Sequence, residues 1–222
     1  MLLAIDTSTR MIGIAVYDGV RVLSEVSWTS NHHHTVELGP AVAETLDRVG
    51  VKSQAIQAVG VAIGPGSFTG LRIGLAFAKG LALSGQAKVF GIPTLDILAT
   101  AQPLSDHNLA AVLEAGRRRI AAGWYRVEGG HWVSQGAPEN LSVEDFVARL
   151  EAQTIVCGEV GDDLRHRLAD MGEDILVETP ARSIRRPAVL AELAWARWLA
   201  GQSEDPSALK PIYLHQGDPI PE

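Results

Sequence analysis

The sequence has one cysteine, no long apolar run and no excess of basic residues. Cys157 is the only cysteine among 222 residues, so the chain has no internal disulfide and offers no cysteine pair to zinc. Because Cys157 ends an apolar run that begins at Thr154, we expect a buried thiol in a reducing compartment. No run reaches the roughly 18 apolar residues of a membrane span, and the start of the chain lacks the basic lead of a signal peptide. These absences predict a cytoplasmic protein without membrane contact.

The charge balance argues against a stand-alone nucleic-acid binder. The formal net charge is −7, and an acidic chain repels a phosphate backbone. Basic residues gather in two short clusters, which are Arg117–Arg119 and the group Arg182, Arg185 and Arg186. We expect each cluster to form a solvated or ion-paired edge rather than an RNA-docking patch. Any contact with RNA should then be weak, local or supplied by a partner.

Short apolar runs alternate with helical patterns along the chain, which is typical of an α/β fold. Strands are predicted at 2–5, 11–17, 21–26, 59–63, 89–92, 109–113, 117–127, 131–133, 154–157 and 175–177. Helices are predicted at 31–49, 70–83, 94–100, 142–150, 162–171 and 187–199. Pro40 should kink or restart the first helix, and the proline-rich end from Ser203 should form an extended arm.

The second half of the chain repeats the opening of the first. A shift of 108 residues aligns Asp6 with Glu114, Arg10 with Arg118, Ile12 with Ile120 and Tyr17 with Tyr125. The identities are few, but the order strand, turn, strand, turn, strand is the same in both halves. This match indicates an internal duplication.

The helix that follows the strand at 59–63 has almost no polar face. From Gly70 to Leu83 its only charged residues are Arg72 and Lys79, which share one narrow stripe. A helix that is apolar nearly all round must be covered on more than one side, and its own sheet covers only one. We therefore expect the other side to contact another protein. The residues predicted for this interface, from this helix and the preceding one, are Leu38, Val42, Leu46, Gly70, Ile73, Gly74, Phe77 and Leu81.

The spacing of small residues on this helix favours close helix packing. Gly70, Gly74 and Ala78 recur every four positions, which lets two backbones approach closely, and the neighbouring apolar ridge can fill a groove. Two interpretations stay open. Both helices could pack only within this chain, or they could dock a partner, in which case the isolated chain should self-associate through the same face.

Four sequence blocks together resemble a known family. They are AIDTST at 4–9, GPGSFTGLRIG at 64–74, GIPTL at 91–95 and PIYL at 211–214. Over its whole length the chain is similar to the bacterial TsaB family, also called YeaZ, and the second block is the most specific. His215 stands where the family often has arginine, so a contact made by that end would be weaker.

The resemblance implies an α/β fold of the actin-like (ASKHA) class. This is a duplicated RNase H-like architecture with two mixed-sheet subdomains. The first subdomain would cover 1–102 and take in the C-terminal helix at 187–200, and the degenerate second subdomain would cover 103–186. Residues 203–222 would form the extended tail.

The resemblance also implies a function. The family supplies the dimerisation subunit of the machinery that makes tRNA threonylcarbamoyladenosine (t6A). The chain would then be a non-catalytic scaffold that binds the catalytic subunit TsaD, supports threonylcarbamoyl transfer to the adenosine beside the anticodon, and helps recruit the ATPase TsaE. It would contact tRNA only indirectly and bind no cofactor alone, with ATP or ADP held, if at all, at an interface of the assembled complex.

A rival interpretation is a small actin-like ATPase or phosphotransferase that acts alone. The residues that could lie near a phosphate are Asp6, Gly64, Gly66, Ser67 and Arg72. The residue after Asp6 is Thr7, and a side chain there hinders close approach of the backbone to a phosphate. A helix end contributes about 0.3–1 kcal/mol to anion binding, whereas micromolar affinity needs about 8 kcal/mol. The loop alone therefore cannot hold a nucleotide.

The sequence predicts neither a metal site nor a catalytic nucleophile. His32, His33 and His34 are consecutive, so their side chains diverge and cannot all reach one ion. We expect them to form a solvated lead-in to the helix. The chain has no Gly-x-Ser-x-Gly elbow, and Ser67 has no base beside it in the sequence.

Overall fold

The computed structural model describes residues 1–31, 33–202 and 204–214 and divides the chain into two compact units. Unit 1 comprises Met1–Ile97 and Arg185–Ile212, and unit 2 comprises Leu98–Ile184 together with Tyr213 and Leu214. The sequence predicts the first boundary at 102/103, whereas the structure has it at 97/98. The difference arises because the boundary between the units falls inside α3 (Thr94–Thr100). The polar stretch that suggested a boundary in the sequence comes after this helix.

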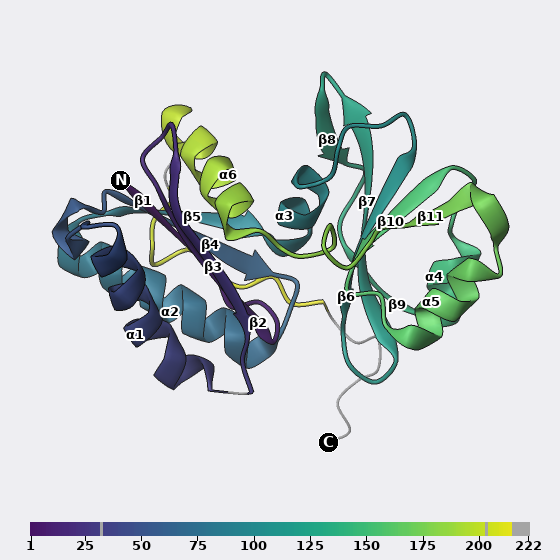
Figure 1. Cartoon of the computed structure of the whole chain (residues 1–222), viewed down its shortest axis with the longest axis horizontal. Helices are drawn as coiled ribbons and strands as arrows, with labels where there is room; N and C mark the ends of the chain where they lie inside the picture. Colours follow the sequence, from purple (N-terminus) through teal and green to yellow (C-terminus); the bar gives the residue numbers. More distant parts are fainter. Residues whose placement is uncertain (32, 203, 215–222) are drawn as a thin grey trace. The chain divides into compact units, whose positions relative to one another are not determined.

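Unit 1 is built on a mixed five-stranded sheet in the order β3-β2-β1-β4-β5 (Figure 1). Its strands are β1 (Leu2–Asp6), β2 (Met11–Tyr17), β3 (Val22–Thr29), β4 (Ala58–Gly64) and β5 (Lys88–Pro93). β1, β2 and β3 pair antiparallel, and β4 and β5 continue the sheet parallel to β1. β1 is buried at every residue, which is expected for a central strand covered on both faces.

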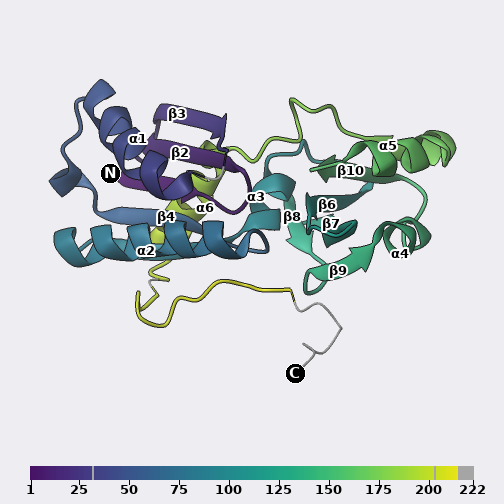
Figure 2. The ribbon, with the colours of Figure 1, turned by 90° about the horizontal axis from the view of Figure 1, so that it is seen from below.

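Helices cover both faces of this sheet. α1 (His34–Arg48) and α2 (Phe68–Gly85) lie side by side on one face, and α6 (Pro187–Leu199) lies on the other (Figures 1 and 2). A short helix, η1 (Ser53–Ala55), precedes β4. The alternation of side chains along β1 produces two cores, because Leu3 and Ile5 pack in the cluster under α1 and α2 while Leu2 and Ala4 pack under α6.

Unit 2 repeats this arrangement. Its strands are β6 (Asn108–Glu114), β7 (Arg119–Glu128), β8 (His131–Ser134), β9 (Glu139–Ser142), β10 (Thr154–Gly158) and β11 (Ile175–Val177). They form a sheet in the order β11-β10-β6-β7-β8, with β9 added on β7. The helices are α4 (Val143–Ala148), α5 (Asp162–Ala169) and η2 (Gly172–Asp174). The core lies between the sheet and the helices, around Phe146 and Leu168.

The two sheets have the same strand order, so the structure agrees with the duplication inferred from the sequence. β8-β7-β6-β10-β11 corresponds strand by strand to β3-β2-β1-β4-β5. The hairpin register differs by one residue, because Asp6 pairs with Gly13 whereas Glu114 pairs with Ile120. The fold is α/β, of the duplicated actin-like class. β9 was not predicted, since Glu139–Ser142 is too short and too polar to show a strand pattern.

The first helix does not restart at Pro40, and the proline-rich end of the chain packs in part on the core. α1 continues through Pro40 as one helix, because Leu38 on one side of the proline and Val42 on the other both pack into the core. The chain end at 204–214 is not a free arm. Leu209 is buried in the core of unit 1, and the N–H of Ile212 donates to the carbonyl of Ile63 at 2.7 Å. His215 lies outside the described residues.

Cys157 lies on β10 and is fully buried. Burial raises the pKa of its thiol to about 12, because the thiolate would lose its hydration. We expect the native chain to react with a thiol reagent at pH 8 orders of magnitude more slowly than the chain unfolded in guanidinium chloride. Stopped-flow labelling with Ellman's reagent measures both rates, and fast labelling of the native chain would contradict the burial.

Within the described residues, no helix is both long and apolar enough to span a bilayer.

Candidate functional site

The hairpin between β1 and β2 holds a buried ion pair. Arg185 Nε donates to Asp6 Oδ2 at 2.9 Å, and both side chains are only 3% exposed. The N–H of Ser8 donates to Asp6 Oδ1 at 2.8 Å, and Arg185 Nη2 donates to the hydroxyl of Thr9. Both carboxylate oxygens of Asp6 are therefore engaged by groups of the same unit. Asp6 is one of the residues that the sequence suggested could lie near a phosphate.

The glycine loop at 64–70 packs directly against this hairpin. A Cβ on Gly66 would lie 2.2 Å from the carbonyl oxygen of Ser8, and one on Gly70 would lie 2.1 Å from that of Thr7. Gly74 approaches Thr7 as closely, since a Cβ on it would lie 2.2 Å from Thr7 Oγ1. The glycines therefore allow α2 to pack on the hairpin, and this contact leaves no room for a side chain on any of them.

Several N–H groups of the loop already have partners. The N–H of Ser67 donates to the Ser8 carbonyl at 2.6 Å, and the N–H of Gly64 donates to the hydroxyl of Thr94 at 3.1 Å. Ser67 also caps α2 by accepting from the N–H of Gly70 at 3.3 Å. Three N–H donors of the loop are thus used within unit 1 and are not available to a phosphate.

The structure gives the five residues proposed near a phosphate a different role. Asp6, Gly64, Gly66 and Ser67 take part in packing and hydrogen bonds within unit 1. Arg72 lies on the exposed side of α2 with its guanidinium carbon 3.9 Å from the centroid of the Phe68 ring. This contact is a cation–π interaction. The role of Arg185 could not be predicted from the sequence, because an arginine in a basic cluster carries no signal that it is buried.

The corresponding hairpin of unit 2 is acidic where a phosphate would need donors. The backbone N–H of Glu114 donates to Glu159 Oε2 at 3.1 Å. The carboxylate of Glu114 lies near the start of α5, with Oε1 2.8 Å from the position of a Cβ on Gly161. Two carboxylates beside the helix N-terminus repel a phosphate at this position.

The residues predicted for a partner surface divide into two groups, and the first group belongs to the core. Leu38, Val42 and Leu46 are only 1%, 3% and 6% exposed, because they pack on the sheet. Gly70 and Gly74 are buried against Thr7. For these five residues the expected partner contact is corrected to a contact within the chain, since a stripe at helical spacing faces the sheet of its own unit first.

The second group is partly exposed. Ile73, Phe77 and Leu81 pack against the core from its edge and keep part of their surface open to solvent. Phe68 at 53%, Leu83 at 80% and, on α1, Val36 at 69% are large apolar side chains in solvent. Exposed small residues lie nearby, namely Pro40 and Ala43 on α1 and Ala76 and Gly80 on α2, and the exposed Arg72 is stacked on Phe68. We call Val36, Pro40, Ala43, Phe68, Ile73, Ala76, Phe77, Gly80, Leu81 and Leu83 the α1/α2 face.

Nothing within the chain requires a glycine at position 80. It lies inside α2, it is exposed, and a Cβ added to it would meet nothing within 4 Å. A glycine inside a helix costs about 1 kcal/mol relative to alanine. Gly39 on α1 is similar, since its Cβ would lie 3.8 Å from Phe77, which is an ordinary contact. Both glycines lower helix stability and leave the helix surface without a side chain at that position. Such a surface is suited to close contact with another helix.

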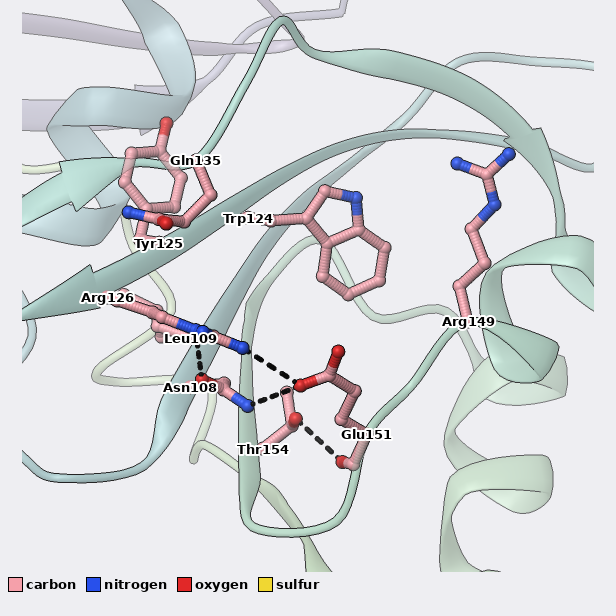
Figure 3. Close-up of a pocket in the computed structure, with 9 residues that line it drawn as sticks. All are labelled: Asn108, Leu109, Trp124, Tyr125, Arg126, Gln135, Arg149, Glu151 and Thr154. Carbon is pink, nitrogen blue, oxygen red and sulfur yellow. Dashed lines mark hydrogen bonds and ion pairs between the residues drawn. The ribbon is translucent and has the colours of Figure 1, made fainter.

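A cavity of about 440 Å³ lies in unit 2 at the amino ends of β6 and β10 (Figure 3). Trp124 forms its wall and stacks on Phe146. Arg126 donates to Asn108 Oδ1 at 2.9 Å and to Glu151 Oε2 at 3.0 Å. The charges of Arg126 and Glu151 in the cavity thus neutralise each other. This arrangement does not prepare a side chain for acid–base or nucleophilic chemistry.

In the described ranges, 1–31, 33–202 and 204–214, no three His, Cys, Asp or Glu side chains come together in a way that could hold a metal ion. Of the histidine run, His34 is buried and its Nε2 lies 2.8 Å from the carbonyl oxygen of Thr9. His33 is exposed. His32 lies outside the described residues.

Comparison with known proteins assigns the chain to a family. Residues 21–155 match the family model TsaD, described as tRNA N6-adenosine threonylcarbamoyltransferase. The chain is 30% identical to the tRNA threonylcarbamoyladenosine biosynthesis protein TsaB of Bacillus subtilis, over 96% of this chain and 93% of that protein. The chain belongs to the TsaB family. This result confirms the resemblance inferred from the four sequence blocks.

Other TsaB relatives give the same result. The Escherichia coli TsaB is 36% identical over 68% of this chain and 66% of that protein. The solved structure of YeaZ from Pseudomonas aeruginosa superposes with a TM-score of 0.80 at 27% identity and covers 96% of this chain and 99% of that chain. The fold of this YeaZ structure is therefore the fold of this chain along nearly its whole length.

Proposed function

We propose that this TsaB-family chain is a non-catalytic dimerisation subunit in t6A biosynthesis. It binds a TsaD-like transferase through the α1/α2 face and supports threonylcarbamoyl transfer to the adenosine beside the anticodon. The observation that carries this proposal is a pair of helices whose outer side combines exposed Val36, Phe68 and Leu83 with glycine at position 80, where the chain itself needs none. Exposed apolar area of this kind marks an interaction site.

Family likeness supports a TsaD-like transferase as the partner. The TsaD model matches residues 21–155, a stretch that contains both α1 and α2. We therefore expect a transferase of that family to have helices equivalent to this pair. Two related surfaces can pair around an approximate twofold axis, as the subunits of a homodimer do. Small residues at the centre allow the four helices to approach closely.

The same relation predicts self-association of the isolated chain. When the transferase is absent, a second copy offers the nearest equivalent of the partner's helices. Analytical ultracentrifugation measures this dimer, which should dissociate as the transferase is added. Recruitment of a TsaE-like ATPase, and ATP or ADP bound at a subunit interface, belong to the assembled complex in this proposal.

The rival function, an ATPase or phosphotransferase acting alone, has less support. Arg185 fills the space in front of Asp6, and Glu114 and Glu159 occupy the corresponding place in unit 2. A nucleotide phosphate at either hairpin would have to displace a buried ion pair or lie beside two carboxylates. Breaking a buried pair costs about 3–5 kcal/mol, which is a large part of the roughly 8 kcal/mol that a micromolar nucleotide supplies.

Reconstitution tests the proposal against its rival. The purified chain is titrated with ATP by calorimetry, and t6A formation is assayed with the TsaD-like subunit, its threonylcarbamoyl-AMP substrate and unmodified tRNA. We expect no heat of ATP binding by the chain alone and transfer only when both proteins are present. ATP turnover by the chain alone, or full transfer without it, would reject the proposal.

A further inference from the structure

The hairpin between β6 and β7 ends in a turn made of two arginines. The N–H of Arg119 donates to the carbonyl of Gly116 at 2.9 Å, so Arg117 and Arg118 are the central residues of a four-residue turn. Their φ angles are +50° and +59°. Positive φ at both central positions defines a type I′ turn, for which Asn-Gly is the favoured pair. Arginine is strained in this region because its Cβ crowds the following carbonyl.

The contacts of Arg118 within unit 2 do not explain why arginine stands in this turn. Its side chain is 83% exposed, and its ion pair with Asp163 spans 3.8 Å between two solvated groups. A pair of this kind contributes little to stability. Arg119 differs, since its guanidinium donates to Asn140 Oδ1 at 2.9 Å and is half-buried. Backbone strain at an exposed, weakly paired residue is evidence for a role in binding.

The charges around the turn select the kind of ligand. Beside it lies a hollow of about 340 Å³ that the arginines line together with four carboxylates, those of Glu114, Glu159, Asp162 and Asp163. A small free anion would have to enter among these carboxylates. A long polyanion need not enter the hollow, because it can contact the exposed tip of the turn, formed by Arg117 and Arg118. The tip therefore fits a phosphodiester backbone better than a free phosphate.

We propose that the Arg117–Arg118 turn contacts the phosphate backbone of an RNA. Guanidinium groups bind phosphate through paired, charge-assisted hydrogen bonds. The hypothesis rests on the proposed function in tRNA modification, and it differs from the solvated or ion-paired edge expected from the sequence. The turn would give this acidic chain one local, salt-sensitive contact with the RNA.

The test replaces the two arginines by the pair that the turn prefers, Arg117→Asn with Arg118→Gly. Unmodified tRNA is titrated by fluorescence anisotropy at several salt concentrations, with the full chain alone and with the chain plus its TsaD-like partner. The slope of log Kd against log salt should fall by about 0.9 per lost phosphate contact. Affinity at low salt should fall about tenfold. The midpoint of thermal unfolding should rise, because the strain is relieved.

Two control variants separate charge from geometry. Arg117→Lys with Arg118→Lys keeps the charge and should keep the salt slope. Arg126→Gln with Arg149→Gln removes the same charge from two residues that line the cavity in Figure 3. In the structure Arg126 pairs with Glu151, and Arg149 pairs with Glu139. That variant should leave the slope unchanged.

Several outcomes would overturn the inference. An unchanged slope in the Asn-Gly variant means that the turn does not contact RNA, and an equal loss in the cavity variant means that only bulk charge matters. A lower unfolding midpoint means that the arginines are structural. Loss of the protein complex with unchanged RNA binding would assign the turn to a protein partner. Failure of the complex to form would reject the proposed function, while the titration of the chain alone would still decide this hypothesis.

Discussion

Replacing Arg185 by methionine should lower the free energy of unfolding of unit 1 by about 3–5 kcal/mol. The substitution leaves the carboxylate of Asp6 buried at 3% exposure without its counter-ion. It also removes the donor to the hydroxyl of Thr9 and the 3.5 Å hydrogen bond to the carbonyl of Met11. Urea denaturation followed by circular dichroism measures the loss.

The adjacent residue provides a matched control. Arg186 pairs with Glu25, but its side chain is 58% exposed, so Arg186→Met should cost no more than about 1 kcal/mol. The double variant Asp6→Leu with Arg185→Met should recover a large part of the loss, since it leaves no unpaired charge in the core. Equal effects of Arg185→Met and Arg186→Met would contradict the buried pair.

Replacing Gly80 by arginine should weaken the complex with the TsaD-like subunit by at least about 3 kcal/mol, or roughly a hundredfold in Kd. The new side chain meets open space in this chain, so the fold is retained and helix propensity improves by about 1 kcal/mol. In the complex it would place a bulky charge where two helices approach closely. Biolayer interferometry measures the affinity. The same change should make the isolated chain monomeric in the ultracentrifuge.

The control for this change lies on the opposite face of the unit 1 sheet. Ala196 is an exposed small residue of α6, so Ala196→Arg adds the same charge to a helix outside the proposed interface (Figure 2). It should leave the affinity unchanged. Gly74→Arg is not a useful test, because the side chain would collide with Thr7 and disturb the fold. Retained affinity in Gly80→Arg would remove the α1/α2 face as the docking surface.

The fold could be predicted in detail because its signals are local. The apolar runs at 2–5 and 59–63 are strands, and Pro187 begins α6 as predicted. Each signal depends on a few neighbouring residues, through side-chain alternation in a strand or the fixed φ of proline. The duplication could be predicted as well, because strands and turns follow in the same order along both halves of the sequence.

The candidate site was harder to predict because it depends on contacts that are distant in sequence. Asp6 and Arg185 are 179 positions apart, and nothing near Arg185 distinguishes a buried cation from a solvated one. Hydrophobic spacing showed that Leu38, Val42 and Leu46 share a face, but it could not say whether sheet or partner covers that face. Gly80 became informative only when the structure showed empty space above it.

The protection of a single thiol tests the central claim most directly. Cys157 is buried, so a cysteine introduced by Ala76→Cys is the only reactive thiol in the native chain. Its alkylation rate should fall sharply when the TsaD-like subunit is added, while that of Ala196→Cys on α6 should not change. An Ala76→Cys thiol that is alkylated equally fast with and without the partner would contradict docking through the α1/α2 face.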